Sequence, residues 1–224
     1  LSNINAHNVS HTLIGEAQYQ RVFSKSVLFN VGLLNTNSSA VADNYLSKVS
    51  ENRVALFSSL KYQSKTKKLN SVLSGRGELV DQTLMFPTLS LQGNYLLKRW
   101  VEFKGKVSTL YRVPTLNDKY WSPGGNIDLL PEKGHSQELG IVVNGKVKKL
   151  FLMRTEWTIF NKKINDWIAW SPAGAFWTPQ NIKKVWSRGI ETQSKLNVKI
   201  QDVDFILNLM TNYVLSTNEE VENE

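Results

Sequence analysis

The chain has 224 residues with a 41% hydrophobic and 21% charged composition, which excludes a disordered protein and a helical membrane bundle. It contains no cysteine, so disulfides, thiolate nucleophiles and cysteine zinc sites are excluded. The formal net charge is +8, but the basic residues are scattered and their densest groups lie in or beside turns, so we expect solvated turns and no nucleic-acid partner.

Apolar and polar residues alternate over nearly the whole chain, which predicts β-strands with one solvated and one apolar face. In 101–112 the odd positions are mainly apolar and the even positions mainly charged or polar. The pattern predicts ten strands, at about 12–22, 27–35, 53–63, 68–79, 88–97, 100–111, 135–147, 150–164, 184–199 and 202–216.

The predicted strands are longer than those of most globular proteins and match the length needed to cross a membrane at a tilt. Their connections alternate between short turns and longer loops at 36–52, 80–87, 112–134 and 165–183. Short turns on one rim and long loops on the other are typical of an outer-membrane barrel. We therefore predict an all-β, antiparallel up-and-down transmembrane barrel, present here as a partial barrel of about ten strands. Tyr111, Trp186 and Tyr213 lie near strand ends, where an aromatic girdle would place them.

One segment carries a specific family pattern. It begins Tyr111-Arg112-Val113-Pro114-Thr115-Leu116-Asn117-Asp118-Lys119-Tyr120-Trp121, continues through Gly124-Gly125-Asn126, and ends Leu130-Pro131-Glu132 with Glu138 leading the next strand. It closely resembles the barrel signature of TonB-dependent receptors. A second stretch, from Asn161 to Trp170 and from Asn181 to Glu191 with Gly189, resembles the strand ends that follow in that family. The similarity is closest to receptors for vitamin B12, haem and siderophores.

The resemblance implies an outer-membrane receptor that binds a scarce ligand, such as a siderophore, haem or cobalamin, and imports it to the periplasm with TonB-coupled energy. It implies as partners a TonB complex acting through an N-terminal plug, a small-molecule or metal-chelate substrate, and outer-membrane lipid. No plug, TonB-contacting box or aromatic-ended last strand is recognisable, so we expect residues 1–224 to be an internal fragment of the barrel domain.

The resemblance and the pattern together predict two groups of site residues. Charged and motif residues are expected to face the lumen or its rim and to meet the plug or pair with one another: Arg112, Pro114, Asp118, Asn126, Pro131, Glu132, Glu138, Gly189 and Glu191. Exposed loop aromatics are the candidate ligand contacts, because flat rings bind large ligands with little loss of entropy: Tyr120, Trp121, Trp167, Trp170, Phe176 and Trp177. The alternative is that these rings pack the loops together or lie at the lipid interface.

Catalytic motifs are missing from the sequence: there is no Gly-rich phosphate loop after a strand, no nucleophile elbow and no Ser, His and Asp set. The histidines His7, His11 and His135 do not form a metal-binding pattern. We expect no enzyme, no metal site and no cofactor.

The alternative function is a soluble β-sandwich that binds carbohydrate; it requires the apolar faces to be buried against a second layer. An outer-membrane enzyme would require a catalytic set in the lumen.

Overall fold

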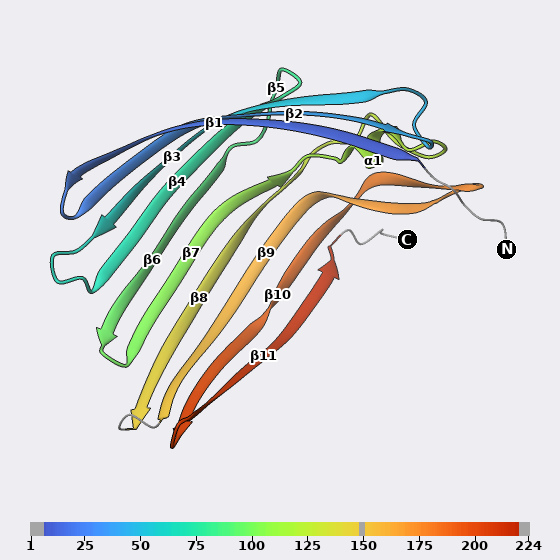
Figure 1. The fold of residues 1–224 in the computed structure, drawn as a ribbon. Helices are drawn as coiled ribbons and strands as arrows, with labels where there is room; N and C mark the ends of the chain where they lie inside the picture. Colours follow the sequence, from blue (N-terminus) through green and yellow to red (C-terminus); the bar gives the residue numbers. More distant parts are fainter. Residues whose placement is uncertain (1–6, 148–150, 220–224) are drawn as a thin grey trace.

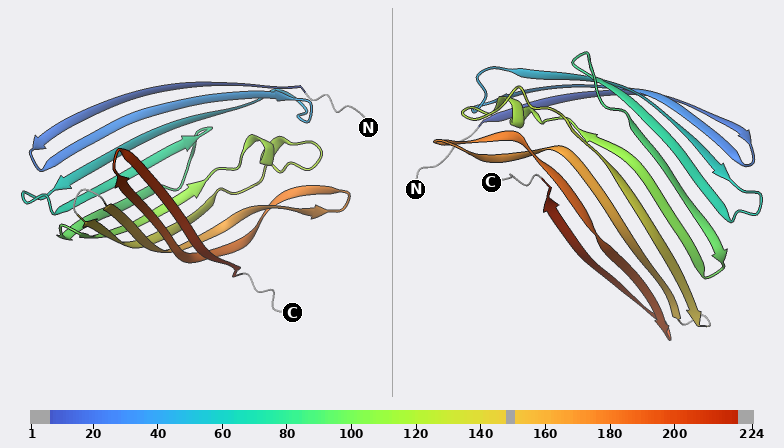
Figure 2. Two further views of the ribbon diagram at one scale, coloured as in Figure 1. Left: turned by 60° about the horizontal axis from the view of Figure 1, so that its bottom comes forward. Right: turned by 180° about the vertical axis from the view of Figure 1, so that it is seen from behind.

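The structure is a computed structural model that describes residues 7–147 and 151–219. It forms a single antiparallel sheet of eleven strands in which chain neighbours are spatial neighbours, in the order β1-β2-β3-β4-β6-β7-β8-β9-β10-β11, with β5 paired to β4 (Figure 1). The sheet is curved like a segment of a barrel wall (Figure 2). Within the described residues β1 and β11 do not pair with each other, so the sheet is open. This architecture confirms the predicted antiparallel up-and-down barrel segment.

The ten long strands coincide with the ten predicted ones, with several ends displaced. Their bounds are β1 Asn8–Ser24, β2 Val27–Ala42, β3 Val49–Gln63, β4 Leu69–Val80, β6 Thr88–Lys98, β7 Val101–Arg112, β8 Glu132–Val147, β9 Phe151–Ala173, β10 Phe176–Ile200 and β11 Val203–Asn218. The structure adds two short elements that alternation does not predict, β5 (Thr83–Leu84) and α1 (Leu116–Tyr120).

Apart from the two-residue β9–β10 turn at 174–175, the connections sort by length onto two rims, as predicted. The short turns 25–26, 64–68, 99–100 and 201–202 lie on one rim, which we call the short-turn rim. The β8–β9 connection belongs to the same series, but 148–150 lies outside the described residues. The opposite, long-loop rim carries 43–48, 81–87 and 113–131.

Two predicted loops were wrong in extent. The loop predicted at 36–52 shrinks to 43–48, because β2 stays paired as far as the Ala42–Asn8 register pair. The loop predicted at 165–183 is a β-hairpin, in which β9 and β10 continue past both of their neighbours and turn at 174–175. This extension, residues 165–183, is called the long hairpin below (Figure 1).

One face of the sheet is apolar and uncovered. Large side chains on it remain exposed, including Leu139 at 64%, Ile159 at 55% and Leu207 at 61%. No second sheet or helix layer packs on this face among residues 7–147 and 151–219. An apolar belt of this kind is what a barrel presents to lipid. The second layer that a β-sandwich requires is therefore not found in the described part of the chain.

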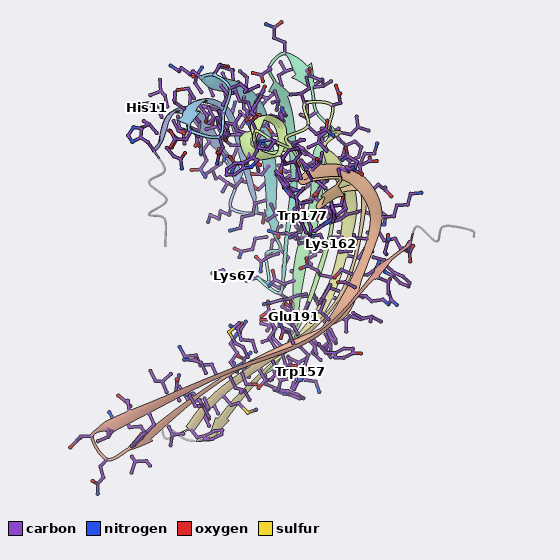
Figure 3. All side chains as sticks on the ribbon, turned by 90° about the vertical axis from the view of Figure 1, so that its right-hand side faces the viewer. His11, Lys67, Trp157, Lys162, Trp177 and Glu191 are labelled. Carbon is purple, nitrogen blue, oxygen red and sulfur yellow. The ribbon has the colours of Figure 1, made fainter. Side chains whose placement is uncertain are left out.

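The other face is polar and carries ion pairs between strands, one joining β7 to β9 across β8 and one joining β7 to β8. Lys104 Nζ lies 2.7 Å from Glu156 Oε2, and Lys106 Nζ lies 3.9 Å from Glu138 Oε1. Figure 3 shows Glu191 on the hollow side of the curved sheet and Trp157 on the opposite side, in agreement with the register, which pairs Trp157 with Thr192, the residue after Glu191. Alternation along each strand therefore separates a polar inner face from an apolar outer face.

Buried apolar residues cluster at the long-loop rim, where Val80, Met85 and Val113 pack together with Tyr111 against them. A barrel wall has no central core of its own, so this small cluster forms where loops fold over the strand ends. Among the described residues, no helix has the length and apolar character that crossing a membrane requires.

Candidate functional site

The family-like segment folds into the loop 113–131, here called the rim loop, which joins β7 to β8 at the long-loop rim (Figure 1). A single helical turn, α1, begins after Thr115. The Thr115 hydroxyl accepts a hydrogen bond from Asp118 N at 3.1 Å, and Thr115 N donates to Asp118 Oδ2 at 2.9 Å. This reciprocal capping box satisfies two donors at the helix start and explains the Thr-x-x-Asp spacing.

An ion-pair cluster holds the base of the rim loop. Arg112 and Glu132 are the last register pair between β7 and β8. Arg112 Nε donates to Glu132 Oε2 at 2.9 Å, its Nη2 also pairs with Glu132, and its Nη1 lies 3.7 Å from Asp118 Oδ2. Glu132 is only 4% exposed and also accepts from Ile168 N at 2.9 Å. One carboxylate therefore joins three strands, and its bidentate arginine partner offsets the cost of its burial.

The rim loop is fastened to the long hairpin by side-chain amides. The Asn181 side chain donates to the carbonyls of Leu130 and Asp166 at 2.9 and 2.7 Å, and its oxygen accepts from Leu130 N at 2.8 Å. Asn126 Nδ2 donates to the Pro179 carbonyl at 3.2 Å. Three of these bonds join the rim loop to the hairpin, and the bond to Asp166 joins the two strands of the hairpin; all four satisfy backbone groups.

A close approach of backbones explains one glycine in the rim loop. Gly124 has a φ of +118°, and a Cβ at this position would lie 2.3 Å from the carbonyl oxygen of Trp177 on the long hairpin. Both the positive φ and the contact disfavour any other residue. The glycine therefore lets the rim loop lie directly against the hairpin.

On its other side the rim loop contacts the 43–48 loop. The Tyr45 hydroxyl donates to Asn117 Oδ1, and Ser122 N donates to the Asn44 carbonyl at 2.7 Å. Tyr45 and Trp121 form an isolated antiparallel bridge. Burial raises the pKa of the Tyr45 phenol above its ordinary value.

A salt bridge extends this contact to strand β3. Lys119 Nζ, on α1, lies 3.8 Å from Glu51 Oε2, while Arg53 Nε binds Glu51 Oε1 at 2.6 Å. Glu51 is 6% exposed. The rim loop thus joins β3 to the β9–β10 hairpin, although β4, β6, β7 and β8 lie between them in the sheet.

The 43–48 and rim loops, together with the start of β3, line an open cavity of about 530 Å³. Its walls are Leu46, Ser47, Val49, Lys119, Tyr120, Trp121, Ser122, Gly124, Gly125, Asn126, Ile127 and Asp128. Two of the aromatics predicted as ligand contacts, Tyr120 and Trp121, line it, and Trp121 is 38% exposed. The cavity combines aromatic and apolar walls with one cation and one carboxylate, a composition suited to a polar organic ligand.

The other four predicted aromatics lie on the long hairpin and not in this cavity. Trp170 Nε1 donates to Asp118 Oδ1 at 3.0 Å and so ties the hairpin to α1. Trp167 is partly buried, while Phe176 and Trp177 are exposed next to the hairpin turn. The structure thus divides the six into two cavity-lining rings, one ring that links loops, one half-buried ring and two exposed rings near the tip.

The remaining predicted motif residues occupy structural positions. Pro114 is fully buried and Pro131 is partly buried at the end of the rim loop. Glu191 borders a hollow on the inner face of β9–β11, and Glu138 faces Lys106. Gly189 is needed for close strand packing, because a Cβ there would lie 2.1 Å from the carbonyl oxygen of Tyr213.

Sequence reasoning missed Tyr45, Glu51 and Lys119, and did not single out the Asn181 side chain. Tyr45 lies 72 residues from its partner Asn117, and Asn181 lies 51 residues from Leu130, so no local spacing links either pair. Among the described residues, no group of three or more His, Cys, Asp or Glu side chains could hold a metal ion.

A family model described as "TonB dependent receptor-like, beta-barrel" matches residues 2–223. The chain belongs to the TonB-dependent receptor family. Within it, the chain is 35% identical over 97 residues to the vitamin B12 transporter BtuB of Vibrio vulnificus, a match that covers 42% of this chain and 15% of that protein. The chain therefore spans only a small part of this relative's length.

Solved structures of receptors in the family show the same fold. The siderophore receptor PirA from Pseudomonas aeruginosa superposes with a TM-score of 0.72 at 17% identity, covering 95% of this chain and 41% of that one. The hemophore receptor HasR of Serratia marcescens, solved in complex with its hemophore and heme, has a TM-score of 0.69 at 13% identity, with 92% and 42% covered. Identities this low establish the barrel fold alone, and this chain spans less than half of each receptor.

Proposed function

We propose that residues 1–224 form part of the wall of an outer-membrane uptake receptor that binds a scarce ligand and imports it with TonB-coupled energy. The observation that carries the proposal is one sheet with an apolar outer face, a polar inner face and its long loops gathered on one rim. Such a sheet satisfies its backbone inside a membrane only as part of a closed barrel. We place the apolar face in outer-membrane lipid and the long-loop rim outside the cell.

Ligand capture is assigned to the long-loop rim. The cavity lined by Tyr120 and Trp121 is the candidate contact, and the exposed Phe176 and Trp177 of the long hairpin extend an aromatic surface beyond it. Siderophores, haem and cobalamin all present flat or ring-rich surfaces that aromatic side chains bind at low entropic cost. The names of BtuB and PirA support the same ligand range, vitamin B12 and siderophores.

The inner face is assigned to contact with a plug domain, through which TonB would act. Its charges, such as the Lys104–Glu156 pair and Glu191, need polar partners or water in the lumen. Receptors of this family are transport proteins and not enzymes, and the inner face supports wall and contact roles for these residues.

Membrane placement is tested by fractionating cells that express the receptor containing this chain. We expect it in the outer-membrane fraction, extractable only with detergent and migrating differently on gels before and after boiling. Recovery in the soluble periplasm without detergent would overturn the proposal.

Uptake is tested separately with labelled cobalamin, ferric siderophores and haem, in cells with and without TonB. We expect TonB-dependent accumulation of one of these ligand classes, and a Tyr120→Ala/Trp121→Ala double variant to weaken its binding by roughly tenfold or more, since aromatic contacts contribute about 1 kcal/mol each. Trp100→Ala, at the short-turn rim and 52% exposed, is the matched control and should bind normally. Equal loss in both variants would remove the loop assignment.

A further inference from the structure

The outer face of β8–β11 changes character abruptly toward the long-loop rim. Three successive rows across the four strands can be read from the register. The first is apolar, with Leu139, Ile159, Ile190 and Tyr213; the second is mixed, with Gln137, Asn161, Arg188 and Leu215; the third is polar and aromatic, with His135, Lys163, Trp186 and Thr217. Rows are two residues apart, roughly 7 Å along a strand. The first basic residues on this face therefore lie in the rows that directly follow the apolar row toward the long-loop rim.

Trp186 is the centre of a cation cluster in these rows, here called the Trp186 cluster and made of Trp186, Arg188 and Lys163. The Arg188 guanidinium carbon lies 3.5 Å from the ring centroid and Lys163 Nζ lies 4.7 Å from it. Trp186 Nε1 donates to Asn161 Oδ1 at 2.5 Å, which fixes the ring. Two positive charges are thus held against one ring, and both would attract an anion bound beside them.

Existing partners leave the cluster with a positive charge. Arg188 Nη1 donates to the Thr217 hydroxyl at 3.2 Å, which is neutral. Lys163 Nζ lies 3.7 Å from Glu219 Oε2, in a pair in which both side chains are more than a third exposed. Such an exposed pair is weak and exchanges readily with a competing anion.

The cation cluster is local and not a general feature of this rim. On β2–β4, the outer positions beyond the apolar Leu33 and Leu56 carry no charge: Asn35, Asn37 and Ser39 on β2, Val54, Asn52 and Ser50 on β3, and Leu79 on β4. A barrel that only needed a hydrated rim could use neutral residues throughout, as it does there. The concentration of cations on β9 and β10 therefore points to a specific anionic partner.

We propose that the Trp186 cluster binds the phosphate of a lipid headgroup in the membrane leaflet on the long-loop side. This inference rests on the proposed membrane placement, because that placement puts the apolar rows among acyl chains and the cluster at headgroup height. Arginine and lysine bind phosphate oxygens with charge-assisted hydrogen bonds, and tryptophan prefers the membrane–water interface. The lipid's acyl chains would then lie along Ile190, Ile159 and Leu139.

The test compares lipid binding by the detergent-purified receptor that contains this chain, wild type and a Lys163→Gln/Arg188→Gln double variant. Native mass spectrometry would count bound phosphatidylglycerol, an anionic lipid, and phosphatidylcholine, a zwitterionic one, across a titration. We expect wild type to bind phosphatidylglycerol preferentially and the double variant to lose roughly fivefold in affinity for each cation removed.

The matched control is Lys195→Gln/Lys199→Gln, which removes the same charge from the opposite face of β10. It should retain the preference. Equal binding of both lipids by wild type, equal loss in both double variants, or full displacement of the lipid by inorganic phosphate would each overturn the inference. A receptor that never enters the membrane fraction would instead overturn the proposed function, so the two failures are distinguishable.

Discussion

The two rims of the barrel wall are stabilised by different kinds of contact. At the short-turn rim the side-chain hydrogen bonds are local: Ser24 caps Ser26, and Ser64 accepts from Leu69 five residues away. At the long-loop rim they join distant segments, as between Asn181 and Leu130. Local contacts form whenever a strand pair turns, whereas distant ones require the whole rim to assemble. The long-loop rim should therefore be the more sensitive to mutation, because some of its polar groups, such as Glu132 and Asn181, hold two or three elements.

The largest expected effect comes from Glu132→Ala. It leaves Arg112 without its bidentate partner and Ile168 N without an acceptor, so we expect a loss of about 3 kcal/mol in the free energy of unfolding. Urea unfolding in micelles, followed by tryptophan fluorescence, measures it. Glu138→Ala is the control: its pair with Lys106 is long and exposed, and its loss should be below about 1 kcal/mol. Equal losses would contradict the difference between buried and exposed pairs.

A smaller effect is expected from Gly134→Ala, near the long-loop end of β8. Its Cβ would lie 2.1 Å from the backbone oxygen of Lys163, so β8 and β9 must separate locally, at a cost of about 2 kcal/mol. Gly145→Ala, toward the other end of β8, meets only Met153 side-chain atoms at 3.6 Å and should change stability by less than about 0.5 kcal/mol. The comparison fails if Gly145→Ala is as destabilising, measured by the same unfolding curves.

Asn181→Ala should cost about 1–2 kcal/mol, because it removes two hydrogen bonds between the rim loop and the long hairpin and one within the hairpin. The sharper readout is hydrogen exchange of the Leu130 amide, which should accelerate while amides of β1 and β2 keep their protection. Unchanged exchange at Leu130 would show that the rim loop is held by other contacts.

The smallest effect is expected at the short-turn rim. Ser64→Ala removes an exposed acceptor for Leu69 N and should cost about 0.5 kcal/mol. Thr115→Ala removes the cap of α1 and should cost about 1 kcal/mol. If Ser64→Ala destabilised the protein more than Thr115→Ala in thermal unfolding in micelles, the proposed difference between the rims would not hold for these two hydrogen bonds.

Alternation is enough to predict every long strand, because each has one face toward the polar interior and one toward the apolar exterior. It fails where that environment ends. The long hairpin carries Pro172 and Pro179 and shifts register between Asn181 and Val185, so its alternation is interrupted although it remains paired. Its strand character comes from cross-strand pairing beyond the sheet, which a period of two does not reveal.

The candidate site likewise contains residues that the sequence can identify and residues that it cannot. Arg112 and Glu132 could be singled out because they belong to a recognisable segment, and the structure pairs them. Glu51 and Tyr45 could not, since their partners on the rim loop are brought near only by the curvature and order of the sheet. The ligand roles of the six predicted aromatics stay predictions, to be decided by the uptake experiment.

The tip of the long hairpin is a suitable position for inserting a label. Gly174 has a φ of +67°, and a Cβ added to it would meet no atom within 4 Å, so it sits in a two-residue turn clear of the rest of the rim. Under the proposed membrane placement, an epitope or fluorophore inserted between positions 174 and 175 would be displayed to antibodies on intact cells. Labelling at this turn would then report which side of the membrane the long hairpin faces in living bacteria.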